Sequence, residues 1–138
     1  MVPVMKFILG RKENMVTFMG NDGLSTAATL IALGTTVVTQ VKDKSTQGYD
    51  AVQIGFGTRP VKNTSKAVQG HSKDLGSFAA MREFRVDDSS AWKKGDKLDA
   101  SLFAIGDEVT ITGISKGKGF QGVVKRHGFH GGPRSHGQ

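Results

Sequence analysis

The sequence predicts a mainly β protein, built as a sandwich or a small barrel, with short helices and a basic, glycine-rich C-terminal end. Six or so short apolar or β-branched runs are separated by turn signals at intervals of roughly ten residues, a spacing typical of all-β domains. No strand–helix–strand alternation of sufficient length is present, which argues against a doubly wound sheet. At 138 residues the chain is expected to form a domain with a core of its own.

The N-terminal part is expected to form strands joined by a tight turn. An apolar run over residues 4–9 has the length of a strand. Residues 15–19 and 24–33 flank Gly20-Asn21-Asp22-Gly23, whose residue types accept a positive φ at little cost, so a hairpin is predicted there. Because residues 24–33 are rich in Thr, Ala, Leu and Ile, a helix over part of them is the alternative.

A second hairpin is predicted in the middle of the chain. Residues 35–41 are almost all β-branched, the composition of a strand. Residues 49–56 alternate strictly and place Val52, Ile54 and Phe56 on one face. A polar turn over residues 43–48 would join the two strands into a hairpin.

The remaining elements before the basic end are shorter. A loop over residues 57–66 precedes a short helix within residues 67–76, and a further strand is predicted over residues 81–86. A turn follows, and an ambiguous apolar segment comes after it. Residues 107–114 alternate again, which predicts a last strand, so we expect a β body over residues 1–114.

Charge divides the chain unevenly. The sequence has no Asp or Glu after Glu108, and residues 109–138 hold five Lys or Arg and three of the four His, whereas the first 108 residues carry 14 basic and 12 acidic groups. We call residues 115–138 the basic arm. Its charge, and a pI near 9.9, favour a polyanionic partner. Nucleic acid fits better than a membrane, because no basic amphipathic helix and no apolar run of membrane-spanning length appear.

The glycine-rich part of the basic arm allows three interpretations. Residues 117–122 fit G-x-G-x-x-G, but only 16 residues follow Gly122 and none is acidic, so the βαβ unit of a dinucleotide site cannot be completed. The segment is then either a flexible connection or a phosphate cradle, in which glycines let backbone N–H groups approach a phosphate between Lys116 and Lys118. A helix beginning within residues 119–127 would add its N-terminal dipole. The spacing of Phe120, Val123 and Val124 would dock one face of it on the body.

Neither a metal site nor a catalytic site is predicted. His127, His130 and His136 are spaced H-x2-H-x5-H, but no Cys and no nearby carboxylate completes a zinc site, and in a cationic arm imidazoles more often contact a base, sugar or phosphate. No G-x-S-x-G motif exists, and the adjacent acidic pairs would point to opposite faces of a strand. We therefore expect no catalytic activity, no cofactor and no small-molecule substrate.

Several segments resemble one known family over essentially the whole chain. The main match is SKGKGFQGVVKRHGF at residues 115–129, followed by GGPRSHG at residues 131–137. Further matches are VVTQVK at residues 37–42, GYDAVQIGFG at residues 48–57 and REFRV at residues 82–86. With these segments the chain resembles the bacterial-type large-ribosomal-subunit protein L-three family, a universal ribosomal protein family.

The resemblance implies an elongation-factor-like β-barrel body and, at residues 115–138, a basic RNA-binding helix with the start of an extension. It implies a non-enzymatic structural constituent of the large subunit of the cytoplasmic ribosome, which binds large-subunit ribosomal RNA, supports assembly near the peptidyl-transferase centre and neighbours other large-subunit proteins. The alternative is a free-standing nucleic-acid-binding β-barrel that acts outside the ribosome. We expect RNA contacts from these residues of the basic arm: Lys116, Lys118, Gly119, Gln121, Lys125, Arg126, His127, His130, Arg134 and His136.

Two departures from the family pattern are visible. The family has Gly-Met-Thr after its first strand, where this chain has Asn14-Met15-Val16. Family members also continue well past the equivalent of His136-Gly137, so the chain is expected to lack the C-terminal part of the family, as a truncated product, a partial sequence or a short form. A barrel without its closing strands would have unpaired edges.

Overall fold

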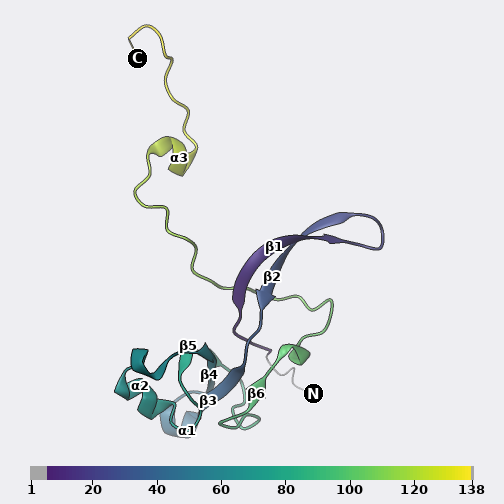
Figure 1. Ribbon diagram of the computed structural model, residues 1–138, viewed down its shortest axis with the longest axis vertical. Helices are drawn as coiled ribbons and strands as arrows, with labels where there is room; N and C mark the ends of the chain where they lie inside the picture. The colour runs from purple at the N-terminus through teal and green to yellow at the C-terminus, as the bar shows by residue number, and fades with distance from the viewer. Residues whose placement is uncertain (1–5, 138) are drawn as a thin grey trace. The chain divides into compact units, whose positions relative to one another are not determined.

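The computed structural model describes residues 6–137, and the chain divides into two compact units, Met1–Gly106 and Asp107–Gln138. The first unit is mainly β, and its strands form two open sheets joined by short helices and loops (Figure 1). The closed barrel implied by the family resemblance is not seen among residues 6–137, where both sheets keep free edges. The barrel therefore stays a prediction, whereas the mainly β class is confirmed.

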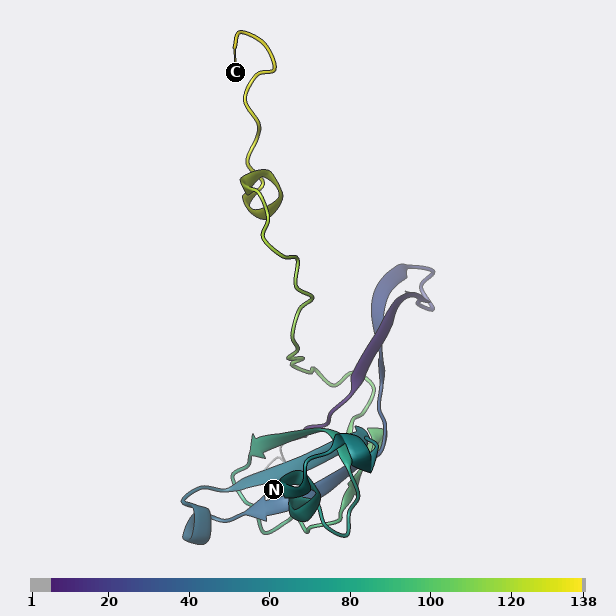
Figure 2. The same ribbon diagram turned by 60° about the vertical axis from the view of Figure 1, so that its left-hand side comes forward.

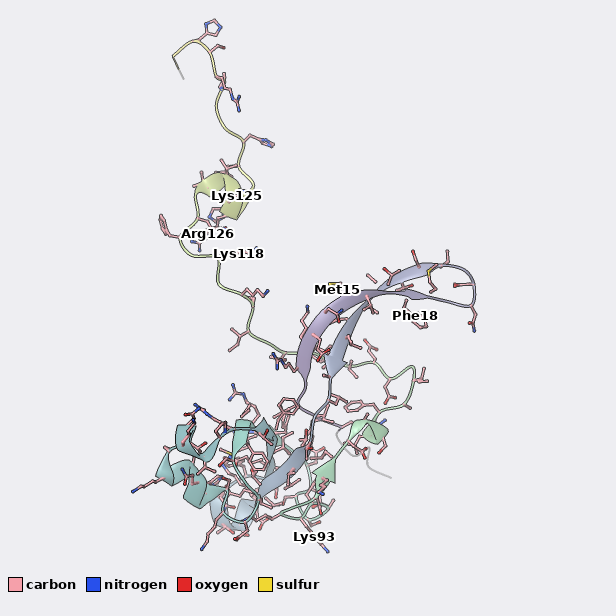
Figure 3. The ribbon with its side chains drawn as sticks, viewed as in Figure 1. Met15, Phe18, Lys93, Lys118, Lys125 and Arg126 are labelled. Carbon is pink, nitrogen blue, oxygen red and sulfur yellow. The ribbon has the colours of Figure 1, made fainter. Side chains whose placement is uncertain are left out.

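The first sheet is a two-stranded hairpin of β1 (Arg11–Met19) and β2 (Ser25–Ala32). At its turn the Leu24 N–H donates to Asp22 Oδ1 at 3.1 Å, and Gly23 adopts a φ of +76°. The hairpin prediction is confirmed, and the alternative of a helix within residues 24–33 is wrong. Met15 and Phe18 are both exposed on this hairpin (Figure 3), so it adds little to the core.

The second sheet has four antiparallel strands in the order β5-β4-β3-β6 (Figures 1 and 2). The predicted central hairpin is confirmed by β3 (Thr36–Lys42) and β4 (Ala51–Thr58), and the strand predicted over residues 81–86 is β5 (Phe78–Arg85). The edge strand β6 (Lys97–Leu98) has only two residues. The β-branched composition of β3 suits this central position, because both of its edges are paired.

Short helices join these strands. The predicted polar turn between β3 and β4 contains α1 (Lys44–Gln47). The predicted short helix is α2 (Lys66–His71), whose N-cap Ser65 accepts a hydrogen bond from the Val68 N–H at 3.5 Å. Two 3₁₀ turns, η1 (Val61–Asn63) and η2 (Ala100–Leu102), lie before α2 and after β6.

The core of the first unit lies on one face of the four-stranded sheet. Val38 of β3 and Val52 and Ile54 of β4 are fully buried, and Phe7 and Leu98 are buried in the same cluster. The alternation of residues 49–56 thus predicted the buried face correctly for Val52 and Ile54. The Phe7 ring stacks on Phe84 with 4.7 Å between ring centroids, although the strand expected over residues 4–9 does not form at residues 6–9. The first two positions of that expected strand lie outside the described residues.

The last predicted strand, over residues 107–114, is wrong. Residues 107–119 form neither helix nor strand, and Ile111 and Ile114 are exposed. An alternating sequence supplies one apolar face, but a strand also needs a neighbour whose backbone N–H and C=O groups complete the ladder. No strand among residues 6–137 pairs with this segment.

The second unit contains one helix, α3 (Val123–His127), within residues 107–137. It begins after Gly122 and ends at Gly128, whose φ of +66° is the left-handed conformation that commonly terminates helices. Phe120, Val123 and Val124 are exposed, so the docking of this face on the body stays a prediction. Within residues 6–137 no helix has the length and apolar character needed to cross a membrane.

Candidate nucleic-acid interface

The cations of the basic arm are exposed and unpaired. Figure 3 shows Lys118 in the segment before α3, and Lys125 and Arg126 on α3. All five Lys and Arg side chains of residues 115–137 are exposed, and within residues 6–137 none of them forms an ion pair. Because an unpaired surface ammonium or guanidinium is free to exchange its counterion for a phosphate, the charge of this segment suits contact with a polyanion.

The glycines leave the backbone before α3 open. Gly119 has a φ of +65°, a conformation that L side chains rarely adopt, and a Cβ added at Gly117, Gly119 or Gly122 would meet nothing within 4 Å. These glycines therefore do not relieve a close contact inside the unit. They leave the backbone N–H groups beside Lys116 and Lys118 unshielded by side chains, which suits an approaching phosphate.

Helix α3 differs from the predicted anion site at a helix N-terminus. It begins at Val123 rather than near Gly119, and it has only five residues, so it supplies no significant N-terminal dipole to the glycine segment. Its basic residues Lys125, Arg126 and His127 lie instead in its last turn, away from the glycine segment.

The remaining site residues are spread along the arm and are not gathered into a pocket. The rings of His127 and Phe129 lie 5.7 Å apart between centroids at an angle of 36°. His130, Arg134 and His136 are exposed, and Gln121 is half-buried. No group of three or more His, Asp or Glu side chains in residues 6–137 is arranged to hold a metal ion. The predicted contact residues therefore form an extended line of chain, a geometry that can follow a nucleic-acid backbone.

Two cations of the first unit, Lys42 and Arg85, interact with other side chains of the protein. Lys42 Nζ lies 2.5 Å from Glu83 Oε2 and donates to Tyr49 Oη at 2.9 Å. The bond to Glu83, with a smaller contribution from Tyr49, raises the pKa of Lys42, and the same bond lowers the pKa of Glu83. Arg85 lies over the Tyr49 ring, 5.2 Å from its centroid. These cations are engaged within the protein and are poor candidates for contact with a partner.

Sequence reasoning missed this difference among the cations of the body. Gln53 of β4 pairs with Glu83, and Ala51 pairs with Arg85, so the strand register brings residues 42, 83 and 85 together across the sheet. Opposite charges on neighbouring strands are a signal for such a cluster, but the signal is usable only once the register is known.

Comparison with known proteins agrees with the resemblance noted in the sequence. The family model described as ribosomal protein L3 matches residues 36–138. Relatives named large ribosomal subunit protein uL3 include that of Alkaliphilus metalliredigens, 48% identical over 135 residues, or 96% of this chain and 64% of the relative. The relative from Herpetosiphon aurantiacus is 45% identical over 132 residues, 95% of this chain and 62% of its own length. The relative from Geotalea daltonii is 44% identical over 134 residues, which are 96% of this chain and 64% of the relative.

These matches extend over most of this chain but over only part of each relative. The chain spans less than two thirds of the length of these three relatives. The family model begins at residue 36, so it leaves out the β1–β2 hairpin, where the sequence departs from the family pattern. It covers all of the second unit and the four-stranded sheet. The chain belongs to the ribosomal protein L3 family.

Proposed function

We propose that this chain is a structural constituent of the large ribosomal subunit that binds large-subunit ribosomal RNA and supports subunit assembly near the peptidyl-transferase centre. The role is a proposal because the chain covers only part of its relatives. It is supported by family membership and by relatives that are named as large-subunit proteins. In this role the chain acts without catalysis or cofactor, in the cytoplasmic ribosome beside other large-subunit proteins.

The observation that carries the proposal is the acid-free, exposed basic arm. Five cations lie in residues 115–138 without a single carboxylate side chain. Outside α3 the segment has no helix or strand of its own among residues 115–137. A chain of this kind gains order when its cations meet phosphates and release the counterions of the RNA.

We assign the RNA contacts to the basic arm and the supporting fold to the body. Residues 1–114 form the body, part of an elongation-factor-like barrel, and residues 115–138 form the RNA-binding helix and the start of an extension. Lysine and arginine side chains bind phosphate oxygens, the glycines admit the RNA backbone, and the imidazoles contact bases, sugars or phosphates. The contact residues are Lys116, Lys118, Gly119, Gln121, Lys125, Arg126, His127, His130, Arg134 and His136.

A salt titration of RNA binding tests the proposal. If all five arm cations contact phosphates, the plot of log K against log salt concentration should have a slope of roughly −3.5 to −4.5 from these contacts. The full chain is titrated by fluorescence anisotropy with an in vitro transcript of large-subunit ribosomal RNA. Lys118→Ala or Arg126→Ala should each weaken binding and flatten the slope by about one unit.

Lys44→Ala is the matched control for this titration. Lys44 is exposed in α1, beside Asp43, so its removal takes away one charge without touching the arm. Its slope should equal that of the parent chain. If Lys118→Ala and Arg126→Ala also leave the slope unchanged, the basic arm does not bind RNA phosphates and the proposal fails.

Sucrose-gradient sedimentation separates the ribosomal role from a free-standing nucleic-acid-binding role. Cells that express the full chain are lysed, and the chain is followed by immunodetection across the gradient. Co-sedimentation with large subunits that is lost in high salt supports the ribosomal role. Confinement of the chain to the light fractions, with RNA binding intact, supports the free-standing alternative.

A further inference from the structure

We propose that residues 93–97, Lys-Lys-Gly-Asp-Lys, which we call the lysine turn, form a second phosphate-binding site in the first unit that contacts the RNA backbone. The inference rests on the proposed function for the nature of the partner. It concerns a surface outside the basic arm, and it rests on the rigidity and the charge of one turn. Figure 3 shows Lys93 on this turn, pointing into solvent.

Hydrogen bonds hold the lysine turn in one conformation. The Lys93 N–H donates to Asp96 Oδ2 at 2.8 Å, and the Asp96 N–H donates to the Lys93 carbonyl at 3.1 Å. The Gly95 N–H donates to the Val38 carbonyl at 2.8 Å, and the Val38 N–H donates to the Asp96 carbonyl at 2.8 Å. Since Val38 is fully buried in the central strand β3, the turn is fastened to the core of the unit.

Both ends of the turn are also anchored by packing. Trp92, immediately before it, packs against the core, with its ring 5.2 Å from the ring of Phe7 between centroids. Leu98, immediately after it, is buried and pairs with Thr36 in the sheet. The three lysine backbones are therefore positioned before any partner arrives, which reduces the entropy lost on binding.

The charge of the turn is not neutralised within the protein. Lys93, Lys94 and Lys97 are exposed, and none forms an ion pair within residues 6–137. The only carboxylate of the turn, that of Asp96, is bonded to the Lys93 backbone N–H. Three ammonium groups against one carboxylate leave a formal charge of +2 on five residues.

Two other exposed lysines of the unit, Lys44 and Lys73, lack this combination. Lys44 follows Asp43, and Lys73 precedes Asp74, so each has an acidic neighbour in the chain that cancels its charge locally. Both are exposed and neither forms an ion pair within the described residues. They provide a matched pair with the same total charge as Lys93 and Lys94 but without local excess charge.

The chemistry of the turn fits phosphate oxygens. Ammonium groups are compact charges that bind a phosphate without a bidentate geometry, and several of them on a rigid turn can follow the repeated charges of one RNA strand. An acidic protein segment is the competing partner, and it is an outcome of the test below.

The test compares two double variants of the full chain, Lys93→Gln with Lys94→Gln, and Lys44→Gln with Lys73→Gln. Each is titrated against salt with the large-subunit ribosomal RNA transcript and, separately, with polyglutamate. Trp92, the only tryptophan, reports whether the neighbouring turn stays packed, and its emission spectrum should be the same in both variants and the parent. The turn variant should flatten the RNA slope by about 1.4–1.8 units, since each phosphate contact contributes roughly 0.7–0.9. The control pair should leave the slope unchanged.

Three results overturn the inference. An RNA slope of the turn variant equal to that of the parent means that the turn does not touch phosphates. Equal flattening by both pairs means that total charge alone matters. Loss of polyglutamate binding with an unchanged RNA slope assigns the turn to an acidic protein. The Lys118→Ala variant distinguishes this failure from failure of the proposed function, because it still flattens the RNA slope if only the lysine turn is misassigned.

Discussion

Replacing Ile54 with Ala should lower the free energy of unfolding of the first unit by about 3–4 kcal/mol. Ile54 is 0% exposed at the centre of β4 and packs in the core cluster with Val38 and Val52. The substitution removes three carbons, worth about 2.4 kcal/mol at roughly 0.8 kcal/mol per buried methylene, and the cavity left behind adds to this cost. The milder Ile54→Val should cost about 0.5–1.5 kcal/mol.

Urea titration followed by Trp92 fluorescence measures this loss, because Trp92 packs against the same cluster. The matched control is Ile114→Ala, the same chemical change at a side chain that is 97% exposed. That variant should change the free energy of unfolding by less than about 0.5 kcal/mol. If Ile114→Ala costs as much as Ile54→Ala, then residues 107–114 are packed as the predicted strand would be, and the assignment of the core to one face of the four-stranded sheet is refuted.

Two further predictions concern glycines and pH. Gly70→Ala should raise the free energy of unfolding by about 0.5–1 kcal/mol, because Gly70 lies in α2 with open space around it. Gly95→Ala should lower it by about 1–2 kcal/mol, since a φ of +95° is strained for alanine; equal urea midpoints for these two variants would contradict the turn conformation. Glu83 has a pKa below its ordinary value of 4.5, so its contribution to stability is fully present above that pH and is lost as the pH falls through the lowered value. Lys42 has a pKa above its ordinary 10.5, so its contribution is lost only as the pH rises through the raised value. Glu83→Gln should therefore flatten the pH dependence of stability below about pH 4.5, and an unchanged acid limb would exclude the ion pair from the acid response.

Local sequence patterns predicted the elements whose partners lie next to them in the chain. The turn at residues 20–23 and the β-branched run at residues 35–41 each have a strand immediately before or after, so turn chemistry and alternation were sufficient to predict both hairpins. The helix alternative at residues 24–33 failed because pairing with β1 outweighs the helix preference of Ala and Leu.

Strands and core residues whose partners lie far away in the chain were not predicted correctly from local patterns. Residues 107–114 alternate as clearly as residues 49–56. Only residues 49–56, however, lie beside strands that complete their backbone hydrogen bonds. Phe7 is a core residue although its segment is not a strand at residues 6–9, since its burial depends on Phe84 and Trp92 from much later in the chain.

The candidate interface likewise has features that the local sequence predicts and features that depend on distant partners. The sequence alone located the basic arm, because a count of charges along the chain needs no three-dimensional information. The sequence also predicted a polyanionic partner for the arm, since no carboxylate lies beyond Glu108. It did not distinguish Lys42 from Lys93, because the first is neutralised by a residue on another strand and the second is not.

The sequence by itself determined the mainly β class, the two hairpins, the charge of the arm and the family, all of which follow from the order of residues along the chain. Only the tertiary structure decided which alternating segment becomes a strand, which apolar face is buried, and which lysines remain free for a partner. The physical reason is that backbone pairing, burial and ion pairing are properties of two groups brought together across long stretches of chain, and their energies depend on the geometry of that meeting.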